Sequence, residues 1–180
     1  MIEIRIHGRG GQGVVICSKV LAMAFFLEGK YTQAFPFFGA ERQGAPVTAF
    51  VRADDKQIYL RCKIYNPDYL IVLDQYLPFE VNITEGLKSG GTIVINGMEK
   101  PEFYNISSDF KVYIVDAATV ASRYGIGSKE LPIVNSAILG AFCKLTNLLN
   151  IDSIEKAIKE FAPVKKEENA DAAVELYNSI

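Results

Sequence analysis

His7-Gly-Arg-Gly-Gly-Gln-Gly-Val14 is the stretch of sequence that decides the fold. Before it, isoleucines alternate with charged residues from Ile2 to Ile6, the pattern of a strand with one buried face, so a strand is expected over 2–7. After it, an apolar run rich in Ala, Leu and Met extends from Val14 to Glu28 and predicts a helix that ends at Gly29. A glycine-rich turn between a strand and a helix can bring an anion against the helix N-terminus.

The glycine loop, Gly8–Gly13, leaves several interpretations open. Its spacing is that of a dinucleotide-binding turn, but such a site also needs an acidic residue about 20 positions later. That region reads Gln33-Ala-Phe-Pro-Phe-Phe38 and has no acid, which disfavours a nicotinamide or flavin nucleotide. A phosphate cradle, with Arg9 adding a bidentate contact, and a tight turn facing a partner subunit both remain. The candidate binding residues here are Gly8, Arg9, Gly10, Gly11, Gln12 and Gly13.

A second notable stretch runs from Phe35 to Pro46. It holds three Phe, two Gly and two Pro in twelve residues and is expected to form a loop. Exposed aromatic residues beside an arginine are the composition of a binding hot spot. The alternative is a loop folded onto its own core. The candidate contact residues here are Glu41, Arg42, Gln43 and Gly44.

The remaining pattern alternates strands with helices, which predicts an α/β fold. Expected strands cover 31–35, 47–53, 57–62, 69–73, 92–96 and 111–115, and expected helices cover 78–88, 117–123, 133–149, 152–161 and 169–180. The turn Asp54-Asp55-Lys56 joins two of these strands as a β-hairpin. The predicted architecture is a three-layer, Rossmann-like fold whose sheet is mostly parallel, with this hairpin as its antiparallel part. Residues 1–164 form a single domain, and 165–180 a charged linker and a C-terminal docking helix.

Composition excludes several classes of protein. The chain has 180 residues, a net charge of −2 and 49% hydrophobic residues, which indicates one globular domain with a sizeable core. A net charge of −2 does not indicate the basic surface that nucleic-acid-binding proteins use. No apolar stretch is long enough to span a membrane, and the N-terminus lacks the pattern of a signal peptide. We therefore expect a cytoplasmic protein without nucleic-acid or membrane partners.

The residues that could carry catalysis or metal binding are few. Zinc and cubane sites need four ligands that usually come in close pairs, whereas Cys17, Cys62 and Cys143 are far apart and His7 is the only histidine, so this chain alone is not expected to hold such a site. His7 is expected to be structural. Asp74 and Asp116 each follow an apolar strand, where helix capping is favoured over ligand binding. No catalytic residue, metal ligand or cofactor bound by this chain alone is predicted.

The two motifs taken together resemble one known family. The glycine loop followed by Gln33-Ala-Phe-Pro-Phe-Phe-Gly-Ala-Glu-Arg-Gln-Gly-Ala-Pro-Val47 is similar to the gamma subunit of pyruvate and related 2-oxoacid:ferredoxin oxidoreductases. The resemblance continues through Asn66–Asp74, Gly90–Asn96 and Asn135–Ala141. It spans most of the chain and becomes loose after Lys165. The glycine loop alone is a weak signal, whereas both motifs at this spacing are highly specific.

The resemblance implies an activity for the whole complex. Such an enzyme oxidatively decarboxylates a 2-oxoacid with coenzyme A to give acyl-CoA, CO2 and reduced ferredoxin. It uses thiamine diphosphate, magnesium and iron–sulfur clusters, which in this family lie on other chains or domains. This chain lacks the Gly-Asp-Gly signature for magnesium and diphosphate. The implied partners are alpha, beta and delta-type subunits, with ferredoxin reached through the complex. The motif is closest in form to that of the pyruvate and branched-chain members.

The resemblance also implies a role for this chain, and two alternative roles remain. As a subunit without a redox centre, it would help assembly and contribute to coenzyme A binding through the glycine loop and Glu41–Gly44. A stand-alone nucleotide-binding or regulatory protein and a purely structural subunit without a ligand are the alternatives. The apolar first helix and the aromatic loop predict self-association when partners are missing.

Overall fold

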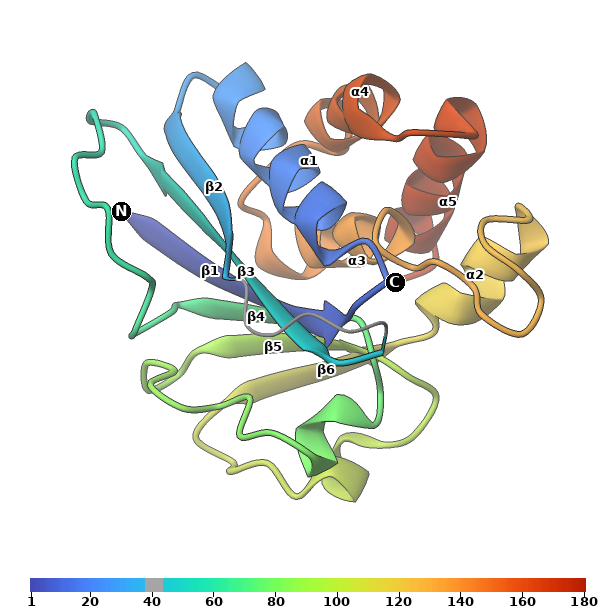
Figure 1. The fold of residues 1–180 in the computed structure, drawn as a ribbon, viewed down its shortest axis with the longest axis horizontal. Helices are drawn as coiled ribbons and strands as arrows, with labels where there is room; N and C mark the ends of the chain where they lie inside the picture. The colour runs from blue at the N-terminus through green and yellow to red at the C-terminus, as the bar shows by residue number, and fades with distance from the viewer. Residues whose placement is uncertain (38–43) are drawn as a thin grey trace.

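The computed structural model describes residues 1–37 and 44–180. Strands and helices alternate along most of the chain (Figure 1). The elements are β1 (Ile2–Arg9), α1 (Val14–Leu27), β2 (Tyr31–Phe37), β3 (Pro46–Asp54), β4 (Tyr69–Val72), η1 (Leu77–Phe79), β5 (Thr92–Asn96), η2 (Pro101–Tyr104), β6 (Lys111–Val115), α2 (Ala117–Arg123), α3 (Ala137–Thr146), α4 (Ile151–Phe161) and α5 (Lys166–Asn178).

The strands of the described residues form one open, mixed sheet in the order β2-β3-β1-β4-β5-β6. β1 pairs in parallel with β4, and β5 and β6 continue in the same direction. On its other side β1 pairs antiparallel with β3, which in turn pairs antiparallel with β2. The α/β class and the mixed, mostly parallel sheet are therefore confirmed.

The two faces of the sheet are covered differently (Figure 1). The α-helices lie over one face, where Ile4, Ile6 and Ile71 of the sheet are fully buried in the main hydrophobic core. On the opposite face, η1, η2 and their loops cover a smaller core that includes Leu70 and Ile95. Alternate residues of β4 and β5 serve the two cores, which explains why these two strands are almost entirely apolar.

Helix α1 is as buried as its composition predicts. Leu21 and Phe25 are almost fully enclosed between the sheet and α4, whereas Phe26 and Leu27 at its C-terminal end are exposed. Gly29 follows with φ +82°, a conformation that glycine adopts without strain, and it ends the helix as expected. In the part of the chain that the structure describes, no helix has the length and apolar character needed to cross a membrane.

The predicted hairpin of 47–53 with 57–62 is wrong. The second segment is not a strand, because both edges of β3 are already paired, with β1 and with β2. Instead, it crosses the sheet face opposite the α-helices, where Arg52 Nη1 donates to the carbonyl oxygen of Cys62 at 2.9 Å. The consecutive antiparallel pair in this fold is β2 with β3.

The predicted helix over 78–88 is also wrong. Only the single 3-10 turn η1 forms, and Gly86 has φ +72° in a turn where an added Cβ would lie 2.1 Å from the carbonyl oxygen of Tyr65. Helix α3 is shorter than the expected 133–149. Helix α5 begins at Lys166, so most of the predicted linker is helical, and its buried alanines pack in the main core.

Candidate functional site

The glycine loop lies at the carboxyl end of β1 and leads directly into α1. Gly11 and Gly13 have φ of +96° and +77°, the left-handed region that favours glycine. Gly13 is the N-cap of α1 and provides no side-chain cap, while its carbonyl oxygen accepts the first helical bond from Cys17 N at 2.9 Å. The N–H groups of Val14, Val15 and Ile16 therefore have no partner within the helix and carry the positive end of its dipole.

The two motifs of the sequence meet here. Gly10 N donates to the carbonyl oxygen of Ala45 at 2.9 Å, and Gly44 N donates to the carbonyl oxygen of Gly10 at 3.2 Å. Of the second motif, Gly44 thus lies beside the glycine loop. Glu41, Arg42 and Gln43 lie outside the described residues, and their predicted contacts stay predictions.

Gln12 holds the loop in shape from within. Its side-chain oxygen accepts from Arg9 N at 2.7 Å, and its side-chain nitrogen donates to Asp74 Oδ2 at 2.9 Å. Asp74 also accepts from Tyr76 N at 3.0 Å. It therefore binds the glycine loop instead of capping a longer helix. The prediction that Asp116 caps a helix is confirmed: it is the N-cap of α2, and its side chain accepts from Thr119 N at 2.9 Å.

Arg9 is paired with two carboxylates. Its Nη1 and Nη2 lie 3.0 and 2.6 Å from the two oxygens of Glu80, and its Nε lies 3.1 Å from Asp74 Oδ2. The hydrogen bond to Glu80 raises the pKa of Arg9 and lowers that of Glu80. Burial acts to raise the pKa of Asp74, but hydrogen bonds from Gln12 and Arg9 outweigh it and the pKa is lowered. A phosphate contact by Arg9 would have to displace these carboxylates.

A cavity of about 460 Å³ lies against the N-terminal turn of α1. Gly11, Gly13 and Ile16 form one wall, and Asn135 and Ser136 before α3 form another. Further lining comes from the segment between α4 and α5, where the φ of Lys165 is +50° and its Nζ donates to the carbonyl oxygen of Gly125 at 2.6 Å. Ile16 of the N-terminal turn, a side-chain amide, a hydroxyl and the Lys165 side chain therefore line one mostly apolar space.

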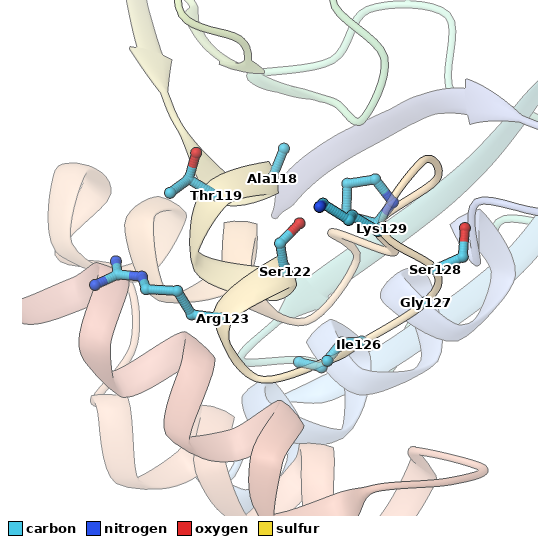
Figure 2. A pocket seen from close by; sticks show the side chains of 10 residues that line it. Ala118, Thr119, Ser122, Arg123, Ile126, Gly127, Ser128 and Lys129 are labelled. Carbon is cyan, nitrogen blue, oxygen red and sulfur yellow. The ribbon is translucent and has the colours of Figure 1, made fainter.

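A second hollow, of about 660 Å³, adjoins this cavity, since Gly125, Ile126 and Gly127 line both. Figure 2 shows its walls, α2 on one side and the loop after α2 on the other. Lys129 extends from the loop toward α2, on the side of Ser122. Arg123 points away from the hollow and forms an ion pair with Glu175 of α5.

His7 directly precedes the loop but faces the opposite side of the sheet. It is almost fully buried, and its Nε2 accepts from Arg5 Nε at 3.0 Å. Burial, and secondarily the charge of Arg5, lowers its pKa to about 3, so it is neutral at physiological pH. This arrangement fits the structural interpretation of His7.

The structure brings together residues that sequence reasoning did not select. Asn135 and Ser136 belong to a stretch that supported the family resemblance, which could have identified them. Lys129 and Lys165 stand in ordinary charged segments, and no local pattern marks them as site residues. Their role depends on how the loop after α2 and the α4–α5 connection fold toward α1.

Comparisons with known proteins give a consistent assignment. The family model for pyruvate ferredoxin/flavodoxin oxidoreductase matches residues 3–178. The pyruvate synthase subunit PorC of Methanocaldococcus jannaschii is 49% identical over 100% of this chain and 97% of its own length. The pyruvate/ketoisovalerate oxidoreductases common subunit gamma of Pyrococcus furiosus is 51% identical over 98% and 96%.

A solved structure agrees with these matches. The crystal structure of pyruvate oxidoreductase subunit PORC from Thermotoga maritima superposes with a TM-score of 0.81 at 34% identity, covering 98% of this chain and 95% of that one. The fold, the two motifs and these matches lead to the same assignment. The chain belongs to the pyruvate ferredoxin/flavodoxin oxidoreductase family, as a gamma subunit of the 2-oxoacid:ferredoxin oxidoreductases.

Proposed function

We propose that this gamma subunit helps its oxidoreductase complex to hold coenzyme A while a 2-oxoacid is oxidatively decarboxylated. The products are acyl-CoA, CO2, one proton and two electrons, and the electrons pass to ferredoxin. Pyruvate is the first candidate substrate, because both the M. jannaschii and P. furiosus relatives carry pyruvate in their names. In this proposal the chain binds and orients a co-substrate, and it carries out no redox step itself.

The single observation that carries the proposal is the pair of joined hollows at the N-terminus of α1. Unpaired N–H groups at a helix N-terminus form a ready anion site. Lys165 and Lys129 add two positive charges along the same path, and Ser122, Ser128 and Thr119 add hydroxyl groups. Coenzyme A is a long molecule with several phosphates, so its shape and charge suit an elongated space with cations at intervals.

Arg9 takes a supporting part in this proposal. Since its guanidinium is occupied by Glu80 and Asp74, we assign it the task of fixing the glycine loop. The direct anion contacts then come from the amides that follow Gly13. Glu41–Gly44 remain proposed contacts to coenzyme A or to a partner subunit, and Gly44 is the member placed beside the loop.

The thiamine and iron–sulfur chemistry is assigned to partner subunits. Cys17 is fully buried, and burial raises its pKa. Cys143 donates to the carbonyl oxygen of Leu149 at 2.9 Å, and burial raises its pKa to about 11. Neither thiol is available as a thiolate ligand at neutral pH. The described residues contain no group of three or more His, Cys, Asp or Glu that could hold a metal ion.

The test is kinetic and uses the assembled enzyme. Lys129→Met and Lys165→Met each remove one cation, while Lys111→Met on the far strand β6 is the matched control. We expect the KM for coenzyme A to rise about tenfold in the two site variants, the size of one charge-assisted contact. The KM for the 2-oxoacid should not change. An unchanged KM for coenzyme A in both site variants, with the complex intact, rejects the proposal.

A purely structural role is the second candidate, and one observation favours it. The only side-chain cation within the glycine loop, Arg9, is already neutralised by two carboxylates of its own chain. A loop of that kind can serve as a rigid surface for a partner subunit. In that case the lysine variants would change neither KM.

A further inference from the structure

The outer edge of the sheet at β2 lacks the usual protection against pairing. Among the residues described, no strand pairs with β2 on the side away from β3. The strand reads Tyr-Thr-Gln-Ala-Phe-Pro-Phe and contains no charged residue. Edge strands normally carry Lys, other charges or Pro, which keep them from pairing with other chains. In β2 only Pro36, near the end of the strand, gives such protection. The outward-facing backbone N–H and C=O groups of Tyr31–Phe35 are left without a neighbouring strand among the residues described.

A polar groove runs along this edge. It has a volume of about 790 Å³ and is lined by four consecutive residues of β2, Thr32–Phe35, and by Gln57–Arg61 of the segment that follows β3. The side-chain nitrogen of Gln33 donates to the carbonyl oxygen of Ile58 at 3.2 Å and sets the segment beside the strand. Four strand residues span roughly 13 Å, which is enough length to template a short added strand.

The segment beside the groove is basic. Arg61 lies in it, and Lys56 and Lys63 flank it; no Asp or Glu occurs from 56 to 65, and Asp54 and Asp55 directly precede Lys56. Among the residues described, none of these three cations forms an ion pair. Lys63 Nζ lies 5.3 Å from the ring centre of Phe37, which is exposed. In a chain of net charge −2, this face therefore favours an acidic occupant.

We propose that the edge of β2 and segment 57–61 receive an acidic, extended segment of a partner subunit of the oxidoreductase, which adds to the sheet as a further strand. Main-chain hydrogen bonds give such strand addition its affinity, and flanking side chains give it specificity. The basic segment would select the acidic partner. This inference rests on membership of a multi-subunit family. It does not rest on the coenzyme A site, which lies at the N-terminus of α1 and beside α2.

The backbone of β2 offers a direct way to test this. Pro36 has no N–H, so it fits the ladder only where the amide points away from β3. Because amides alternate along an antiparallel strand, Thr32 and Ala34 share that direction. Ala34→Pro therefore removes an outward donor and leaves the bonds to β3 in place. Ala34 is exposed, so the side chain itself costs little packing.

The primary experiment compares backbone amide exchange in the assembled complex and in the isolated chain. We expect amides of Thr32 and Ala34 to exchange at least tenfold more slowly in the complex. Ala34→Pro, and separately Lys56→Glu with Arg61→Glu, should weaken retention of this subunit in the complex about tenfold. The effect of the charge reversals should shrink as salt rises. Lys19→Glu with Lys111→Glu is the control on other faces and should leave retention unchanged.

Three outcomes would overturn the proposal. Exchange at Thr32 and Ala34 could be the same in both states, which means that no strand is added. Protection could appear in the isolated chain and grow with its concentration, which means that a second copy of this chain is the occupant. Both sets of charge reversals could act equally, which means that net charge rather than this surface governs assembly. If Ala34→Pro fails to fold, the exchange data and the charge reversals still decide.

Discussion

Asn135 Nδ2 donates to the carbonyl oxygen of Gly13 at 3.3 Å and joins the start of α3 to the start of α1, 122 positions apart in the sequence. A Cβ added at Gly13 would lie 2.4 Å from the same nitrogen atom. The two residues therefore fit together only because position 13 has no side chain. The contact also forms one corner of the cavity at the helix N-terminus.

Gly13→Ala should destabilise the isolated chain by at least about 2 kcal/mol, since a left-handed alanine costs about 1–2 kcal/mol and the clash with Asn135 adds to it. Adding Asn135→Ala should return part of this loss, because it removes the clash but not the backbone strain. Urea unfolding of the two single variants and the double variant measures the coupling. Strictly additive effects would show that the two residues do not constrain each other.

The sequence predicted the elements whose neighbours along the chain determine them. The strand before the glycine loop, the helix after it and the strands at 69–73, 92–96 and 111–115 all have a strong apolar pattern and clear turn residues at their ends, and all are present. The family resemblance was also correct, because it rested on two motifs at a fixed spacing.

The wrong predictions concern segments whose structure depends on contacts with residues far away in the sequence. Segment 57–62 has strand-like residues, but β1 takes the place beside β3 that this segment needed. Segment 78–88 has helix-forming residues, but the close approach of Gly86 to Tyr65 requires a turn. The same applies to the candidate site. Lys129 and Lys165 come to it from loops, whose course over α1 depends on packing across the whole molecule.

Gly140 is the point of closest approach between α3 and α5. A Cβ there would lie 1.8 Å from the backbone carbonyl oxygen of Ala173, and neither helix can move without disturbing the main core. Gly140→Ala should therefore cost more than about 3 kcal/mol or prevent folding. Gly29→Ala is the control, because it has φ +82° but open space around it and should cost only about 1–2 kcal/mol. Equal losses by thermal unfolding would contradict this view of α5 as a tightly docked helix.

Asp74 connects the glycine loop to the segment that follows β4. Asp74→Asn removes the ionic contact with Arg9 and weakens the hydrogen bond that Asp74 accepts from the Gln12 side chain. The substitution should therefore destabilise the chain by about 1–2 kcal/mol. Asp109→Asn, an exposed position, should change stability by less than about 0.5 kcal/mol. Faster amide exchange over Gly10–Gly13 in the Asp74 variant, but not in the Asp109 variant, would locate the loss in the loop.

His7 should make stability depend on pH in a window set by its two pKa values. The folded-state pKa is about 3 and the ordinary value is 6.5, so between these values the unfolded chain binds a proton that the folded chain excludes. Stability is therefore full above pH 6.5 and falls as pH decreases toward 3, by up to about 1.4 kcal/mol per pH unit. Protonation would also remove the acceptor of the Arg5 Nε–H group and place two positive charges together.

In His7→Gln the side-chain oxygen can accept the same hydrogen bond without titrating. Urea unfolding from pH 4.5 to 7 should give a steep slope for the natural chain and a shallower one for the variant, and equal slopes would assign the pH dependence to carboxylates instead.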